Sequence, residues 1–185
     1  MDGTAAEKEF LVSKHMKCTP RELLGLAVRI ERNGEAYYLK MAEKAKQPAA
    51  KKMFEFLAGQ ERQHIVDFGK IITSLGAEAD KIPAAYQDVK VEGYLDALAD
   101  GMVFPSTDTL ENAAKAAKKI TTDFEAALHA LQFEKDAIIF FSEVLEMLPA
   151  ASSDRKAVLE LIKQEKIHIA RLHTLVAQIQ AEKEN

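Results

Sequence analysis

Four long stretches of this sequence place apolar residues at helical spacing, and residues that break helices separate them. The first stretch begins at Thr19-Pro20-Arg21-Glu22, which combines a capping hydroxyl, a proline at the first helical position and a capping-box glutamate. Gln47-Pro48, Gly76 and Pro149 lie at the later breaks. The pattern predicts helices at about 20–45, 49–75, 122–148 and 154–182.

The order of these helices indicates how they pack. Short breaks join the first helix to the second and the third to the fourth, so we expect each pair to form an antiparallel hairpin. Residues 77–121 join the two hairpins and are long enough to travel the length of a bundle. One long crossover between hairpins is the connectivity of a ferritin-like four-helix bundle. We therefore predict an all-α fold, with residues 19–185 as one domain and residues 1–18 as an N-terminal extension.

Composition supports this class and narrows the range of functions. The 185 residues include only 8 glycines and 5 prolines, as long helices require. A formal net charge of −4, with lysines spread among glutamates, argues against a nucleic-acid partner. No apolar run reaches the roughly 18–20 residues of a membrane span, and no basic segment followed by an apolar one opens the sequence. We expect a cytoplasmic protein that binds neither nucleic acid nor membrane.

Cys18 is the only cysteine, which limits the chemistry of any metal site. A single cysteine forms no internal disulfide, and the sequence has no Cys-x-x-Cys pair to hold zinc or a rubredoxin-type iron. A metal site in this chain must therefore use oxygen and nitrogen ligands.

The sequence twice places a carboxylate and an imidazole three residues apart. Glu61-x-x-His64 lies in the second predicted helix and Glu165-x-x-His168 in the fourth, so each pair occupies one helical face. A single pair is weak evidence, because an inward Glu or His is more often satisfied by Arg, Lys, Tyr or buried water. Two pairs in corresponding helices are more specific.

The spacing of other residues shows that the two halves of the chain repeat. Glu31 lies thirty residues before the first pair, and Glu134 lies thirty-one before the second. Tyr38 and Phe141 each follow these glutamates by seven residues. An internal duplication accounts for both the polar and the packing positions.

The charge of this set indicates metal binding. Four ionised carboxylates in one core would each cost several kcal/mol of desolvation and would repel one another. Two divalent cations balance them, with the two imidazoles as neutral ligands. Oxygen-rich ligation with one imidazole per metal suits iron or manganese better than structural zinc, so we predict two iron ions, with manganese or a mixed pair as the alternative. The predicted ligands are Glu31, Glu61, His64, Glu134, Glu165 and His168.

These residues resemble the rubrerythrin branch of the ferritin-like superfamily. The resemblance covers the four long helices and rests on Glu31 with Tyr38, on Glu134 and on the two Glu-x-x-His pairs. It implies a di-iron carboxylate site inside the bundle and a redox reaction with a small oxidant. Full-length rubrerythrins add a four-cysteine rubredoxin module that delivers electrons, so a chain with one cysteine implies an external electron donor.

A second departure concerns the third helix. Rubrerythrins tend to carry a further glutamate one turn from the ligand of this helix, whereas Leu131, Ala137 and Ile138 occupy those places here. The resemblance is therefore more specific for the bundle and the metal pair than for a peroxidase reaction.

Three hypotheses about function follow. The first is a rubrerythrin-like oxidoreductase that reduces peroxide or dioxygen at the metal ligands, with no separate catalytic residues. The second is an iron-binding, ferroxidase or iron-handling protein without catalytic turnover, and the third is a metal-free helical interaction module.

We also predict a homodimer. Glu35 and Tyr38 are candidates for hydrogen bonding to the predicted ligands.

Overall fold

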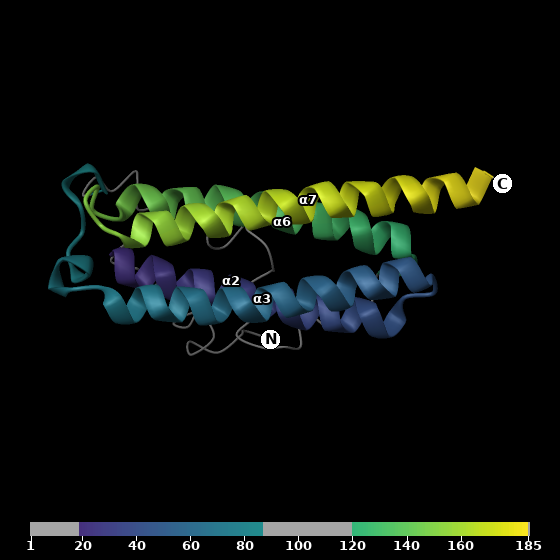
Figure 1. Ribbon diagram of the computed structural model, residues 1–185, viewed down its shortest axis with the longest axis horizontal. Coiled ribbons are helices and arrows are strands. Elements are labelled where there is room, and N and C mark those ends of the chain that lie inside the picture. The colour runs from purple at the N-terminus through teal and green to yellow at the C-terminus, as the bar shows by residue number, and fades with distance from the viewer. Residues whose placement is uncertain (1–18, 87–119, 185) are drawn as a thin grey trace, which may run out of the picture.

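Two helical hairpins pack against each other in the computed structural model, which describes residues 19–86 and 120–184 (Figure 1). The hairpins confirm the predicted all-α fold, and the described residues contain no strand. The helices are α2 (Pro20–Lys44), α3 (Pro48–Ser74), η1 (Ala77–Asp80), η2 (Ala84–Tyr86), α6 (Asp123–Met147) and α7 (Asp154–Glu184). The ends of the four long helices lie within two residues of the ranges expected from the sequence.

Contacts at the two ends of the bundle show how the hairpins are connected. Asp123, at the start of α6, accepts hydrogen bonds from the backbone N–H groups of Lys46 and Gln47 in the turn between α2 and α3. At the opposite end, the Ser74 hydroxyl donates to Asp154 at the start of α7 over 2.7 Å. The end of α3 and the start of α6 therefore lie at opposite ends of the bundle (Figure 1). Most of this expected crossover, residues 87–119, and the extension 1–18 lie outside the described residues.

Two equivalent capping boxes begin the first helix of each hairpin. Thr19 and Glu22 cap α2, as the sequence predicts, and Thr122 and Glu125 cap α6 with the same reciprocal hydrogen bonds. Each threonine stands twelve residues before a glutamate of the predicted site. The repeat between the two halves thus includes the point at which each helix starts, which sets the register of its buried face.

The apolar core is divided into two clusters by a layer of polar side chains. The first core cluster includes Met41, Phe54, Ala127 and Leu172. The second core cluster includes Leu24, Phe68, Phe141 and Leu161. In each long helix the predicted metal ligands fall between the residues of one cluster and those of the other. None of the described helices is both long enough and apolar enough to cross a membrane.

Candidate metal centre

The structure brings all six predicted ligands into the polar layer between the two core clusters. Each of the four long helices contributes at least one of them, and every side chain is buried. The six residues and their exposed fractions are Glu31 (2%), Glu61 (4%), His64 (0%), Glu134 (3%), Glu165 (1%) and His168 (1%).

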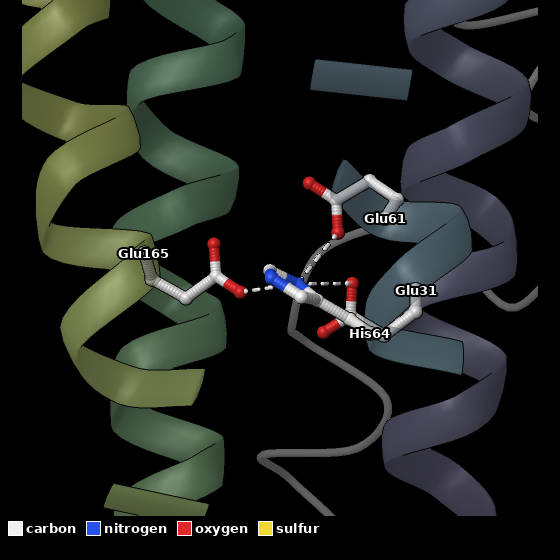
Figure 2. A group of neighbouring side chains, drawn as sticks. All are labelled: Glu31, Glu61, His64 and Glu165. Carbon is white, nitrogen blue, oxygen red and sulfur yellow. Dashed lines mark ion pairs between the residues drawn. The ribbon is translucent and has the colours of Figure 1, made fainter. Parts of the chain in front are cut away.

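These side chains form two overlapping groups of four. The first group is Glu31, Glu61, His64 and Glu165 (Figure 2). The second group is Glu61, Glu134, Glu165 and His168. Within each group one ligand atom per residue lies within 4.8 Å of all the others, a spacing close to twice a metal–oxygen bond of about 2.0–2.4 Å. Glu61 and Glu165 belong to both groups, so they are positioned to be shared between two ions.

Each histidine turns its Nδ1 atom towards three carboxylates. His64 Nδ1 lies 2.9 Å from Glu165 Oε1 and 3.5 Å from an oxygen of both Glu31 and Glu61 (Figure 2). The second half repeats this pattern around the other ring. His168 Nδ1 lies 2.8 Å from Glu165 Oε2 and 3.5 Å from Glu134 Oε2. The imidazoles therefore offer the same nitrogen to equivalent places in the two groups.

Burial and mutual repulsion shift the protonation of the carboxylates. Desolvation raises the pKa of Glu31, and it raises the pKa values of Glu61 and Glu134 further, with help from neighbouring carboxylates. Burial also opposes ionisation of Glu165, but the close imidazoles of His168 and His64 outweigh it and lower the pKa of this carboxyl. Without a nearby cation, ionisation is therefore unfavourable for Glu31, Glu61 and Glu134.

The pKa values of the two imidazoles are also raised, but the cause is the neighbouring carboxylates and not burial. Burial alone would lower the pKa of His168, but the carboxylates of Glu134 and Glu165 raise it to about 9. The pKa of His64 is raised in the same way by Glu165, Glu31 and Glu61, which overcome its desolvation. Without a metal ion, protons on these rings provide the positive charge that the buried carboxylates need.

The donor set fits two divalent cations. No lysine or arginine is among the buried polar side chains of the described residues, so no fixed cation neutralises the four carboxylates. Glu31 Oε1 has no hydrogen-bond partner, and His64 Nδ1 and Glu165 Oε1 lie 2.9 Å apart without forming a hydrogen bond of good geometry. Lone pairs left without a donor inside a core are explained by an ion that accepts them.

Residues around the cluster partly match the sequence expectations. The Tyr38 hydroxyl donates to Glu134 Oε1 over 2.6 Å, so this side chain contacts a candidate ligand. Glu35 instead pairs with Arg62 at 2.6 Å on the outer side of the helices. Sequence reasoning missed Gln164, whose Oε1 lies 3.0 Å from His64 Nε2. The signal was present, because a glutamine directly precedes the glutamate in both Glu-x-x-His pairs.

A bundle of two hairpins that gathers glutamates and Glu-x-x-His pairs from four helices around one buried centre defines a ferritin-like carboxylate protein. The sequence profile of the rubrerythrin family matches residues 22–176 of this chain, and the chain belongs to that family. The crystal structure of a candidate ferritin-like diiron-carboxylate protein from Thermotoga maritima is similar. The two share 29% identity over 89% of this chain and 97% of the other, with a TM-score of 0.67. No curated protein matches the chain.

Replacing one shared carboxylate should separate stability from metal binding. Glu61→Gln replaces an acid whose pKa burial raises well above its usual value, so folding at neutral pH no longer requires this group to take up a proton. The new amide can also donate to Glu31, and we therefore expect the metal-free protein to gain about 1–3 kcal/mol of stability. Metal affinity should fall at the same time, because both groups lose a charged ligand. Urea unfolding and metal titration measure the two effects. Glu55→Gln, on the exposed side of α3, is the control and should change neither.

Gly34 gives a second test of how closely the ligands are packed. A Cβ atom at this position would lie 3.3 Å from Glu61 Cγ, whereas one at the exposed Gly25 of the same helix would meet nothing within 4 Å. Gly25→Ala should therefore stabilise the metal-free protein by about 0.5–1 kcal/mol. Gly34→Ala should increase stability by less than Gly25→Ala does, and it should weaken metal binding, because the Glu61 side chain must move away from the new Cβ atom. Equal stabilisation by both, with unchanged metal affinity, would contradict this packing.

Proposed function

We propose that the cluster binds two iron ions and that the protein is an oxidoreductase that reduces peroxide or dioxygen there. The observation that carries this proposal is the pair of four-residue groups that share Glu61 and Glu165. Membership of the rubrerythrin family supports it, as does similarity to a protein described as diiron-carboxylate. In this proposal an external donor supplies the electrons.

The residues divide between the two ions as their groups do. Glu31 and His64 would hold one ion, Glu134 and His168 the other, and the shared carboxylates both. Reduction of hydrogen peroxide to two waters consumes two electrons and two protons. Two ferrous ions, each giving up one electron, supply the electron pair when they are bound.

The protein's own side chains provide charge and orientation. Ionised carboxylates favour the ferric over the ferrous state because they compensate a higher positive charge. Burial, followed by the charges of Glu134 and Glu61, raises the pKa of Tyr38 well above its ordinary value, so this hydroxyl keeps its proton and orients Glu134 by donating to it. The apolar clusters on both sides of the polar layer exclude water from the site.

Stopped-flow spectroscopy tests the reaction. Protein loaded anaerobically with two equivalents of ferrous iron is mixed with hydrogen peroxide or with dioxygen, and near-ultraviolet absorbance follows ferric iron. We expect rapid oxidation by at least one oxidant, and renewed oxidation after a one-electron donor has reduced the product. Glu61→Gln should slow the oxidation and Glu55→Gln should not. Iron that binds but reacts with neither oxidant would contradict the proposal. Oxidation that cannot be reversed by a donor would favour iron handling without turnover.

A further inference from the structure

The two halves of the cluster are alike in their ligands but differ in what holds each histidine from outside. His64 Nε2 lies 3.0 Å from the side-chain oxygen of Gln164, which comes from α7 in the other hairpin. Gln60 occupies the same place in the other pair, directly before Glu61. The contacts of the described residues include no hydrogen bond between Gln60 and His168. Instead the Phe56 ring meets His168 edge-on, with ring centroids 6.1 Å apart, and Arg171 lies over Phe56.

The hydrogen bond from His64 to Gln164 constrains the imidazole in two ways. An amide oxygen only accepts hydrogen bonds, so the Nε2 atom facing it carries a hydrogen. The same contact fixes the rotation of the ring, with Nδ1 directed at the oxygens of Glu31, Glu61 and Glu165. A ring held in this way loses less freedom on binding a metal. The hydrogen bond at Nε2 also raises the basicity of Nδ1, which makes Nδ1 a stronger metal ligand. An edge-on aromatic contact provides neither effect for His168.

We propose that Gln164 is a positioning residue for His64 and that it makes the two metal positions unequal. The ion held by Glu31 and His64 binds more tightly and first, and the ion held by Glu134 and His168 binds second. This inference rests on the proposed binding of two ions. It adds an order of binding that the near-symmetric ligand set does not contain.

Gln164 is a suitable residue to substitute because it is only half-buried. It lines a groove of about 390 Å³ between α3 and α7, together with Leu161 and Asp67 among others. A leucine of similar size at this position should therefore be accommodated without opening a cavity in the core. Gln60 is half-buried as well, which makes Gln60→Leu a matched control in the other pair.

Calorimetric titration with Zn²⁺ alone, which has no redox chemistry, measures the affinity of each of the two metal positions. Wild-type protein should bind two ions in two separable steps. Gln164→Leu should weaken the tighter step about 10–100-fold, as the loss of a hydrogen bond to a ligating histidine does elsewhere. Gln60→Leu should leave both steps unchanged. Gln164→Glu keeps an acceptor of the same length and should restore most of the tighter step.

Nitrogen-15 NMR of the histidine rings gives a readout that does not depend on metal affinity. The His64 Nε2–H signal should be protected from solvent exchange in wild-type protein and in Gln60→Leu, and it should be lost in Gln164→Leu. An unprotected His64 N–H in the wild type, unchanged zinc binding in Gln164→Leu, or equal weakening by both leucine variants would each overturn the role of Gln164. Wild-type protein that binds neither Zn²⁺ nor Fe²⁺ would contradict the proposed function as well. Thermal melting of each metal-free variant checks that it is folded.

Discussion

The burial of four carboxylates at the centre of the bundle is the constraint on which the rest of the structure depends. Each lies almost completely out of water, and the buried side chains of the described residues include no lysine or arginine to compensate them. Protonated imidazoles can supply only part of the missing charge. Such an arrangement is costly for stability alone, and it is the kind of cost that folds carry at functional sites. Two divalent cations would remove that cost, because they would match the charge and coordinate oxygens such as Glu31 Oε1 that lack a hydrogen-bond partner.

The rest of the fold holds this charge in place. One apolar cluster lies on each side of the polar layer, so the two ends of every long helix are anchored in dry core while its middle turns face the cluster. Thr19 and Thr122 start α2 and α6 at equal distances from Glu31 and Glu134. Equal spacing brings the two glutamates to the same level of the bundle, where the pairs from α3 and α7 meet them.

Much of this arrangement could be predicted from the sequence, because it depends on periodicity within single helices. The breaks at Pro48 and Pro149, the repeat between the two halves and the inward faces of the six polar residues are all local signals. Tyr38 was a candidate for contact with a ligand for the same reason, since it lies two turns after Glu31 on the same face.

Contacts between helices could not be predicted in this way. Glu35 lies one turn from Glu31, but its carboxylate pairs with Arg62 of α3 at 2.6 Å and not with a residue of the cluster. The contact between Gly34 and Glu61 and the bond from Gln164 to His64 depend on how closely two helices approach. Spacing along one helix carries no information about that distance. The duplication predicts equal halves, and only the packed structure shows that the surroundings of His64 and His168 differ.

The central claim is that a pair of cations compensates the buried carboxylates. Diffraction from crystals of the iron-loaded protein, measured on both sides of the iron absorption edge, tests it most directly. Two anomalous peaks should lie between the helices, one among Glu31, Glu61, His64 and Glu165 and the other among Glu61, Glu134, Glu165 and His168. No anomalous density there, with the same side chains joined to one another by protons or water, would contradict the account.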